Sequence, residues 1–210
     1  MHSFFRISLI VILSSAFCGK VYAQHMGSGF TASVGLTYPT TRYASEAFKP
    51  GWAVKGAGFA GADFINVQFT GGFEMWHLKE YAYSTDPFMD SIIRDGGGDP
   101  VSHTFVGLGI EAGTPANFPV RLSALMEGNV GLYFGRAAYV LRQLKRDPMN
   151  HVIHWAGGFG LSARLDFRLS QTEETATFFF VKYEYRGLAA QLENNRFNGI
   201  QIGLAMWTFD

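Results

Sequence analysis

The sequence has few of the residues on which catalytic, metal-binding or disulfide-linked proteins depend. Its 210 residues include one cysteine, Cys18, and equal numbers of acidic and basic residues, 17 of each. Without further cysteines a disulfide framework, a thiolate metal site and a cysteine nucleophile are excluded from the rest of the chain. Zero net charge argues against a nucleic-acid-binding protein, because the broad basic field that such proteins use is missing.

Charge and long apolar runs are also scarce. Charged residues make up 16% of the chain, whereas it holds 25 glycines and 16% aromatic residues. Beyond the N-terminal segment no stretch approaches the roughly 18 consecutive apolar residues that indicate a membrane helix. A barrel with a lipid-facing outside and a crowded interior has this balance.

The N-terminal segment has the pattern of a cleavable signal peptide. Arg6 precedes an apolar stretch from 7 to 17, and the small residues Val21 and Ala23 lie three and one positions before the expected cleavage site. The apolar stretch is shorter than the roughly 20 residues of a spanning helix. We therefore expect residues 1–23 to be removed.

Cleavage after Ala23 leaves a mature chain of one domain, residues 24–210, that begins with Gln24. Cys18 offers a lipoprotein as the alternative. Phe17 argues against it, because lipoprotein processing requires a small residue at that position.

The mature chain contains eight stretches in which apolar and polar residues alternate. In one of them Val120, Leu122 and Ala124 alternate with Arg121 and Ser123. A period of two is the signature of a strand with two different faces. The predicted strands are 28–38, 52–62, 66–77, 102–113, 120–135, 152–169, 175–187 and 196–209.

Short and long connections alternate between these strands. The connections at 63–65, 114–119 and 170–174 are short, and those at 39–51, 78–101, 136–151 and 188–195 are long and polar. Outer-membrane barrels have short periplasmic turns and long external loops. The pattern predicts an all-β fold, an eight-stranded antiparallel up-and-down transmembrane β-barrel. A soluble lipocalin-like barrel or a sandwich is the alternative, although neither needs this asymmetry.

The chain resembles the small outer-membrane barrels of the OmpA and OmpX kind, within the broad outer membrane β-barrel, porin-like superfamily. The most motif-like part is the last strand, residues 198–209, which ends in Trp207-Thr208-Phe209. The resemblance implies an integral protein of the outer membrane of a Gram-negative bacterium. It also implies a monomer that contacts outer-membrane lipid and lipopolysaccharide.

The same resemblance implies insertion by the barrel-assembly machinery, which reads the last strand. The assembly-signal residues would be Gly203, Met206, Trp207 and Phe209. One departure is that the apolar residues from Ile200 to Met206 are out of phase with Trp207 and Phe209. A bulge in the strand would reconcile the two phases.

The alternation places a set of charged residues on the inner face of the barrel. An eight-stranded barrel is filled by its own side chains, so these charges must pair with one another. We predict a lumen charge network rather than an open pore, with a gated ion path or a buried reactive site as the alternatives. The residues are Lys55, Glu74, Glu111, Arg121, Glu127, Arg164, Asp166, Arg168, Lys182, Glu184 and Arg186.

One pair in this network can be predicted in detail. If the turn between the second and third strands is centred between Phe64 and Ile65, Lys55 lies directly opposite Glu74. Both side chains then point into the lumen. A bulge among the nearby glycines would instead turn Lys55 to the other face.

Aromatic residues near the strand ends predict girdles at the two membrane interfaces. Binding of a ligand by aromatic residues in the external loops is the alternative. The predicted girdle residues are Tyr38, Tyr43, Trp52, Trp76, Tyr81, Tyr133, Tyr139, Trp155, Tyr183, Tyr185 and Trp207.

No catalytic residues and no cofactor are expected. Ser102 and His103 are adjacent, so on a strand their side chains face opposite ways. His77 and His103 flank the second long loop, but a metal site needs further ligands, and none is predicted.

The expected function is therefore non-enzymatic, a structural or surface-interaction role carried by the external loops, with an extracellular ligand or an envelope protein as the partner. Two alternatives stay open. One is a small gated channel or a component of an envelope transport or secretion assembly. The other is a rim enzyme that modifies lipid A or phospholipid.

Overall fold

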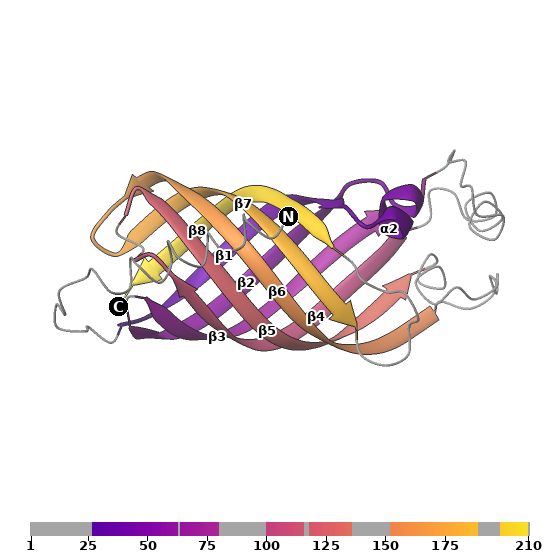
Figure 1. Ribbon diagram of the computed structural model, residues 1–210, viewed down its shortest axis with the longest axis horizontal. Coiled ribbons are helices and arrows are strands. Elements are labelled where there is room, and N and C mark those ends of the chain that lie inside the picture. Colours follow the sequence, from indigo (N-terminus) through magenta and orange to yellow (C-terminus); the bar gives the residue numbers. More distant parts are fainter. Residues whose placement is uncertain are drawn as a thin grey trace, which may run out of the picture.

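The protein forms a closed β-barrel (Figure 1). The computed structural model describes residues 27–62, 64–79, 100–115, 118–135, 152–188 and 198–209. The strands are β1 (Gly27–Pro39), β2 (Gly51–Ala62), β3 (Ile65–His77), β4 (Pro100–Gly113), β5 (Val120–Gly135), β6 (Val152–Gln171), β7 (Thr175–Leu188) and β8 (Gly199–Phe209), and a short helix, α2 (Arg42–Ala47), lies between β1 and β2.

Each strand pairs antiparallel with its neighbours in the sequence, and β8 closes the barrel on β1. The closing register pairs Gly29 with Phe209 and Gly35 with Gly203. At this seam the backbones are close, because a Cβ added to Gly203 would lie 2.0 Å from the Val34 carbonyl oxygen. The predicted eight-stranded antiparallel barrel is confirmed, and every strand end lies within three residues of its predicted position.

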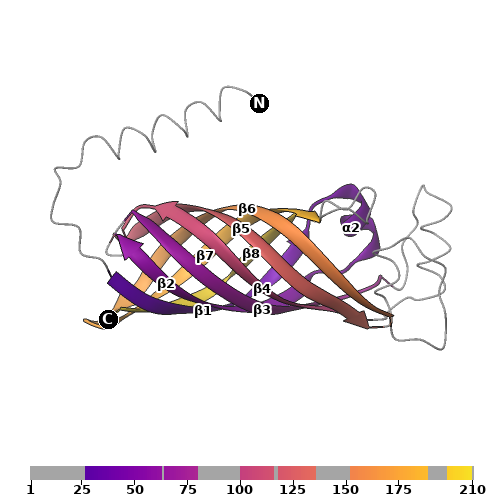
Figure 2. The same cartoon turned by 90° about the horizontal axis from the view of Figure 1, so that it is seen from below.

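The two ends of the barrel differ. The start of β1 and the end of β8 lie at one end (Figure 2), which also carries the connections β2–β3, β4–β5 and β6–β7 and is called the turn end below. α2 lies at the opposite end, the loop end. The predicted signal peptide falls outside the described residues, as do residues 80–99, 136–151 and 189–197 of the longer connections.

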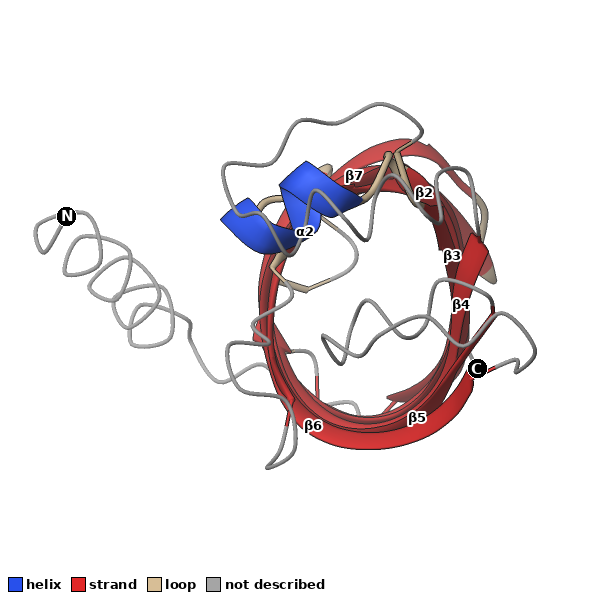
Figure 3. Cartoon of the chain, turned by 90° about the vertical axis from the view of Figure 1, so that its right-hand side faces the viewer, coloured by secondary structure: helices blue, strands red, loops and turns tan. Residues whose placement is uncertain are grey.

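At the loop end the first connection folds back over the barrel rim, a feature that the sequence did not predict (Figure 3). Phe48 forms a β-bridge with Leu78, and the Lys79 backbone N–H donates to the Ala47 carbonyl at 2.9 Å. Phe48 and Leu78 are buried, together with Trp76. These contacts form an apolar layer at the loop end of the lumen.

The register between β2 and β3 differs from the prediction. Ala62 pairs with Ile65, so the turn consists of Asp63 and Phe64, the two-residue connection that hairpins most often use. Lys55 therefore lies opposite Gly72, and the predicted direct opposition of Lys55 to Glu74 is wrong. The two residues still share the inner face, because the actual partner lies two positions from the predicted one.

The bulge that would reconcile the two phases of β8 does not occur. β8 pairs with β1 and β7 without a register shift, and its side chains alternate from Ile200 to Trp207. Ile202 and Leu204 face outward, whereas Trp207 is 3% exposed and lies in the lumen. The predicted place of Trp207 in an interfacial girdle is wrong. Phe209 lies in the strand, but its side chain is outside the description.

Among the described strand pairings, the one register shift lies in β6, between Arg168 and Ser170. It lies at the turn end, where β6 meets β7. The β6–β7 turn is held by the Thr172 backbone N–H, which donates to the Thr175 carbonyl at 2.8 Å. No helix among the described residues is long and apolar enough to cross a membrane.

Candidate functional site: the lumen charge network

The outer surface of the barrel is apolar. Phe69 and Leu108 are 63% and 62% exposed, which in a water-soluble protein would leave a large apolar patch in contact with water. On the strands whose side chains are described, no Lys, Arg, Asp or Glu lies on this face. Charge at mid-membrane costs roughly 2–4 kcal/mol for Arg or Lys, so this surface is suited to lipid.

On the outer face, the tyrosine and tryptophan side chains that the structure describes lie toward the loop end. Trp52 and Tyr38 are exposed there, and Tyr183 is exposed on β7. The Trp52 ring lies 5.3 Å from that of Phe73. These positions fit an interfacial girdle.

Other predicted girdle residues lie elsewhere. Trp76 and Tyr133 are 2% and 4% exposed and face the lumen, so for them, as for Trp207, the girdle prediction is wrong. The side chains of the predicted girdle residues Tyr43, Tyr81, Tyr139 and Trp155 are outside the description. Tyr185 is half-buried on the outward side of β7.

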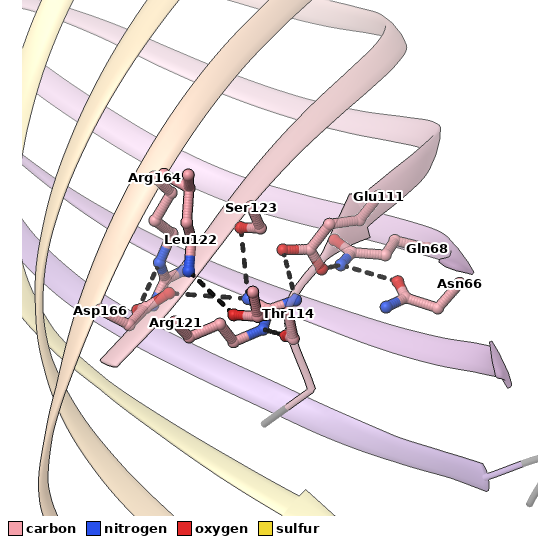
Figure 4. A network of polar contacts seen from close by, with 9 residues as sticks. All are labelled: Asn66, Gln68, Glu111, Thr114, Arg121, Leu122, Ser123, Arg164 and Asp166. Carbon is pink, nitrogen blue, oxygen red and sulfur yellow. Dashed lines mark hydrogen bonds and ion pairs between the residues drawn. The ribbon is translucent and has the colours of Figure 1, made fainter. Parts of the chain in front are cut away.

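A cluster of arginines and carboxylates occupies the lumen near the turn end (Figure 4). We call it the arginine cluster; its members are Glu111, Arg121, Arg164 and Asp166. Arg121 contacts Glu111 at 2.8 Å and Asp166 at 3.6 Å. Arg164 contacts the other oxygen of Asp166 through Nη2 at 2.6 Å and donates to it from Nε at 2.7 Å. Asp166 is fully buried and is shared by both guanidinium groups.

Neighbouring groups fix this cluster further. Arg121 Nε donates to the Thr114 carbonyl at 3.1 Å, and Arg121 Nη1 donates to Ser123 Oγ at 3.2 Å. Gln68 donates to Glu111. Because Arg121 has directed bonds on several sides, its guanidinium is held in one orientation.

Aromatic rings cover the same cations. The Arg121 guanidinium lies 4.5 Å from the centroid of a Trp207 ring, and that of Arg164 lies 4.3 Å from the Phe180 ring. Trp207, Phe178 and Phe180 form an apolar cluster with β8 Ala205, against which Phe59 packs. Inward-facing aromatic side chains thus close the lumen beside the charges.

A second cluster of charges lies nearer the loop end. We call it the lysine cluster; its members are Lys55, Glu74, Lys182 and Glu184. Lys55 Nζ lies 3.1 Å from Glu74 Oε1 and 3.1 Å from Glu184 Oε2. Lys182 Nζ contacts the same Glu184 oxygen at 2.9 Å. One carboxylate therefore binds two ammonium groups.

The pair between Lys55 and Glu74 is diagonal across the β2–β3 ladder. The residue opposite Lys55 is Gly72, and a Cβ there would lie 2.7 Å from the Phe105 ring. Because Gly72 has no side chain, the Phe105 ring fits over this position, and Lys55 Nζ lies 5.1 Å from its centroid. The small residue thus makes room for both the ring and the diagonal ion pair.

Glu127 lies between the two clusters and is 8% exposed. Thr70 Oγ1 donates to it at 2.8 Å and Asn129 Nδ2 at 3.2 Å. It borders a cavity of about 60 Å³, which Lys55, Arg164 and Lys182 also line. A second cavity of about 40 Å³ lies toward Glu111 and Trp207. Such volumes hold a few water molecules and no open bore.

Two of the predicted network residues are not placed in either cluster. Arg168 lies at the turn end, where it donates to Gln171 in an exposed position, so it is not buried within either cluster. Arg186 pairs with Gly160 in the β6–β7 ladder, but its side chain is outside the description. The other nine predicted residues all face the lumen.

Sequence reasoning missed the inward-facing aromatic residues. Phe105, Phe178 and Phe180 share the phase of the charged residues on their own strands, and Trp207 shares the phase of the inward-facing residues of β8. Trp207, for example, is in phase with Gln201 and Gly203. Strand phase was the signal that would have found them, whereas position near a strand end was misleading.

The described residues offer no metal site, because no group of three or more His, Cys, Asp or Glu side chains among them is arranged to hold an ion. His77 and His103 do not approach each other as a pair. His77 is on the outward phase of β3, and His103 is buried in the lumen beside Glu74. Ser102 precedes His103 on β4 and takes the opposite phase.

The closed barrel, its apolar outer face and its charged lumen define an integral outer-membrane β-barrel of the small eight-stranded class. The resemblance to OmpA- and OmpX-like proteins is thus confirmed at the level of fold. No family model matches the sequence, and no curated protein matches it.

Among solved structures, the chain is similar to Neisserial surface protein A, with 9% identity and a TM-score of 0.51 over 86% of this chain and 96% of the other. It is also similar to Ail, the attachment invasion locus protein of Yersinia pestis. The Ail complex with the heparin analogue sucrose octasulfate has 10% identity and a TM-score of 0.44 over 87% of this chain and 98% of that one. At 9% identity the similarity to Neisserial surface protein A establishes the fold alone.

Proposed function

We propose that the protein is a non-enzymatic outer-membrane barrel whose external loops carry a structural or surface-interaction role. The observation that carries this proposal is the filled lumen. Ion-paired side chains occupy it from Glu184 to Asp166, and two cavities lined by the described residues of these clusters measure about 60 and 40 Å³. A filled barrel is a rigid support, so recognition falls to the loop end.

The proposed orientation places the turn end in the periplasm and the loop end outside the cell, as in other outer-membrane barrels. The partners are outer-membrane lipid and lipopolysaccharide around the wall, and an extracellular ligand or an envelope protein at the loops. Closure of β8 on β1 supports a monomer, because it leaves no strand edge for another copy to pair with. Insertion by the barrel-assembly machinery through β8 is part of the proposal.

The absence of enzymatic activity is likewise proposed. Its support is the environment of His103, which stacks on Tyr133 and faces Glu74. Ser102, its neighbour in sequence, takes the opposite phase of β4. A serine nucleophile and its base must lie within hydrogen-bonding reach on one side of the wall.

The test is a deletion strain complemented with the wild-type barrel or with a barrel in which residues 80–99 are replaced by a short Gly-Ser turn. The matched control replaces residues 116–117, at the turn end, in the same way. Surface adhesion, envelope permeability and lipid A composition are measured in each strain.

We expect the loop replacement to insert normally and to lose the adhesion phenotype, while permeability and lipid A stay unchanged. Full adhesion with residues 80–99 replaced would contradict a role for that loop. Altered permeability in the deletion strain would favour a gated channel or transport component, and a changed number of acyl chains on lipid A would favour a rim enzyme.

A further inference from the structure

His103 occupies a distinctive position in the barrel wall. It lies directly across the β3–β4 ladder from Glu74 and directly across the β4–β5 ladder from Tyr133. Its Nδ1 is 3.5 Å from Glu74 Oε2, and its ring stacks on that of Tyr133, with centroids 4.0 Å apart and planes 6° apart. His103 is 3% exposed and Glu74 is fully buried.

The groups around His103 come from four strands. Glu74 on β3 is the nearest charge, and Lys55 on β2 binds the other oxygen of that carboxylate. Glu184 and Lys182 on β7 lie beyond Lys55.

The phenol of Tyr133 on β5 is the other titratable group in contact with His103. The residue across from Tyr133 on β6 is His154, a register position whose side chain is outside the description. Phe105 stacks on the remaining side at 5.1 Å.

Glu74 and His103 lie at the base of the β3–β4 stem. We use this name for residues 74–79 and 100–104, which lead into and out of the second long connection. The next inward-facing pair toward the loop end is Trp76 with Val101, and both are buried. Leu78 follows and contacts the first connection through its bridge to Phe48. A change in the attraction between Glu74 and His103 therefore affects the stability of the strand ends that carry the second long connection.

The nearest charge to His103 is the carboxylate of Glu74, which favours a cation at this position. Between the two clusters and Glu127, the described lumen holds four cations and five carboxylates when His103 is neutral. The cations are Lys55, Arg121, Arg164 and Lys182, and the carboxylates are Glu74, Glu111, Glu127, Asp166 and Glu184. A proton on His103 adds a fifth cation to these four, beside Glu74; the side chain of Arg186, also on the inward phase, is outside the description.

We propose that protonation of His103 strengthens its bond to Glu74 and thereby stabilises the β3–β4 stem. At lower pH a hydronium ion of the solvent transfers its proton to the neutral ring and becomes water, and both ring nitrogens of the imidazolium then carry N–H donors. The imidazolium donates to Glu74 Oε2 in a charge-assisted bond, and Lys55 keeps Glu74 Oε1 and Glu184. Histidine changes charge between about pH 5 and 8, so the stem tightens as the pH outside the cell falls.

This inference goes beyond the proposed function, because it concerns the stem itself and holds whether or not the loops bind a ligand. The test uses the full mature chain in lipid nanodiscs. Amide hydrogen exchange is measured for residues 74–79 and 100–104 at pH 5 and pH 8 and corrected for intrinsic exchange. The ring signal of His103 is followed by NMR over the same range.

We expect protection of these amides to be roughly tenfold greater at pH 5 than at pH 8, the effect of one hydrogen bond to a charged group. His103→Gln, which keeps a polar side chain without a titratable charge, should abolish the difference. Glu74→Gln should abolish it as well. His77→Gln, on the outward phase of the same stem, is the matched control and should leave it intact.

Equal protection at the two pH values, or a pH difference that persists in His103→Gln, would overturn the proposal. If His103→Gln does not fold, the wild-type NMR titration decides. A His103 ring that keeps one charge state from pH 5 to pH 8 contradicts the proposal. A ring that titrates over the same pH range as the protection of the stem amides supports it. Neither outcome depends on the adhesion assay that tests the proposed function.

Discussion

The arginine cluster and the lysine cluster fill the same lumen with different chemistry. In the arginine cluster the planar guanidinium groups of Arg121 and Arg164 converge on a fully buried carboxylate, and each stacks on an aromatic ring. In the lysine cluster two ammonium groups share Glu184, and Lys55 divides its contacts between two carboxylates. Directed, stacked pairs are fixed in geometry, whereas point charges on flexible stems can exchange partners.

The two clusters lie at different positions along the barrel axis. The arginine cluster lies near the short turns, where the strands end in tight connections and the wall needs a rigid closure. The lysine cluster lies below the apolar layer of Phe48, Trp76 and Leu78, next to the stem of the second long connection. We infer that the arginine cluster stabilises the barrel as a whole. The lysine cluster mainly affects the stability of the strand ends that carry the loops.

The largest effect is expected from the centre of the arginine cluster. Asp166→Asn removes the charge that Arg121 and Arg164 share and leaves a buried cation without compensation, which costs about 3–5 kcal/mol of unfolding free energy. Urea unfolding followed by heat-modifiable gel migration measures it. Glu184→Gln is the matched change in the lysine cluster and should cost less, because the side chain of Glu184 is 13% exposed whereas that of Asp166 is fully buried. An equal cost for both variants would remove the distinction between the clusters.

A smaller loss is expected at the loop end. Glu74→Ala should lower the unfolding free energy by about 1.5–3 kcal/mol, the range for hydrogen bonds to charged groups. The double variant with Lys55→Ala should lose less than the single change, because no ammonium group is then left facing an emptied position. A double-mutant cycle should return a coupling of about 0.5–3 kcal/mol. Zero coupling would show that the diagonal pair contributes nothing.

Exchange of one cation type for the other sharpens the same comparison. Arg121→Lys keeps the charge but loses the bond to the Thr114 carbonyl and the stacking on Trp207, at a cost of about 1–2 kcal/mol. Lys182→Arg, in the lysine cluster, should change stability less. Because Trp207 lies against Arg121, its fluorescence should shift in Arg121→Lys alone; a shift of the same size in Lys182→Arg would contradict this assignment.

Much of the fold follows from the period of two in the sequence. Alternation in stretches such as Val120–Leu132 was enough to place all eight strands and the inward phase of Lys55, Glu74 and Asp166. The prediction fails where a side chain was judged by its type and not by its phase, as with Trp76 and Trp207, because an aromatic ring also fills a narrow lumen. The folded first connection with α2 had no periodic signal, since it spans only six helical residues.

The pairings within the lumen were beyond sequence reasoning. Which acid meets which base depends on the register of every ladder around the barrel, and a turn misplaced by one residue moved the partner of Lys55 from Glu74 to Gly72. Contacts such as Lys55 with Glu184 join strands distant in sequence, and no local pattern contains that information. The inner face was predictable, but its network was not.

The central claim is that paired charges and inward-facing aromatic rings seal the lumen. Planar bilayer recordings of the purified wild-type protein test it most directly, because a bore left open by an eight-stranded wall would pass ions. The account predicts no large stable conductance, with at most small and rare openings through the lysine cluster. Reproducible nanosiemens steps from the wild-type protein would contradict it.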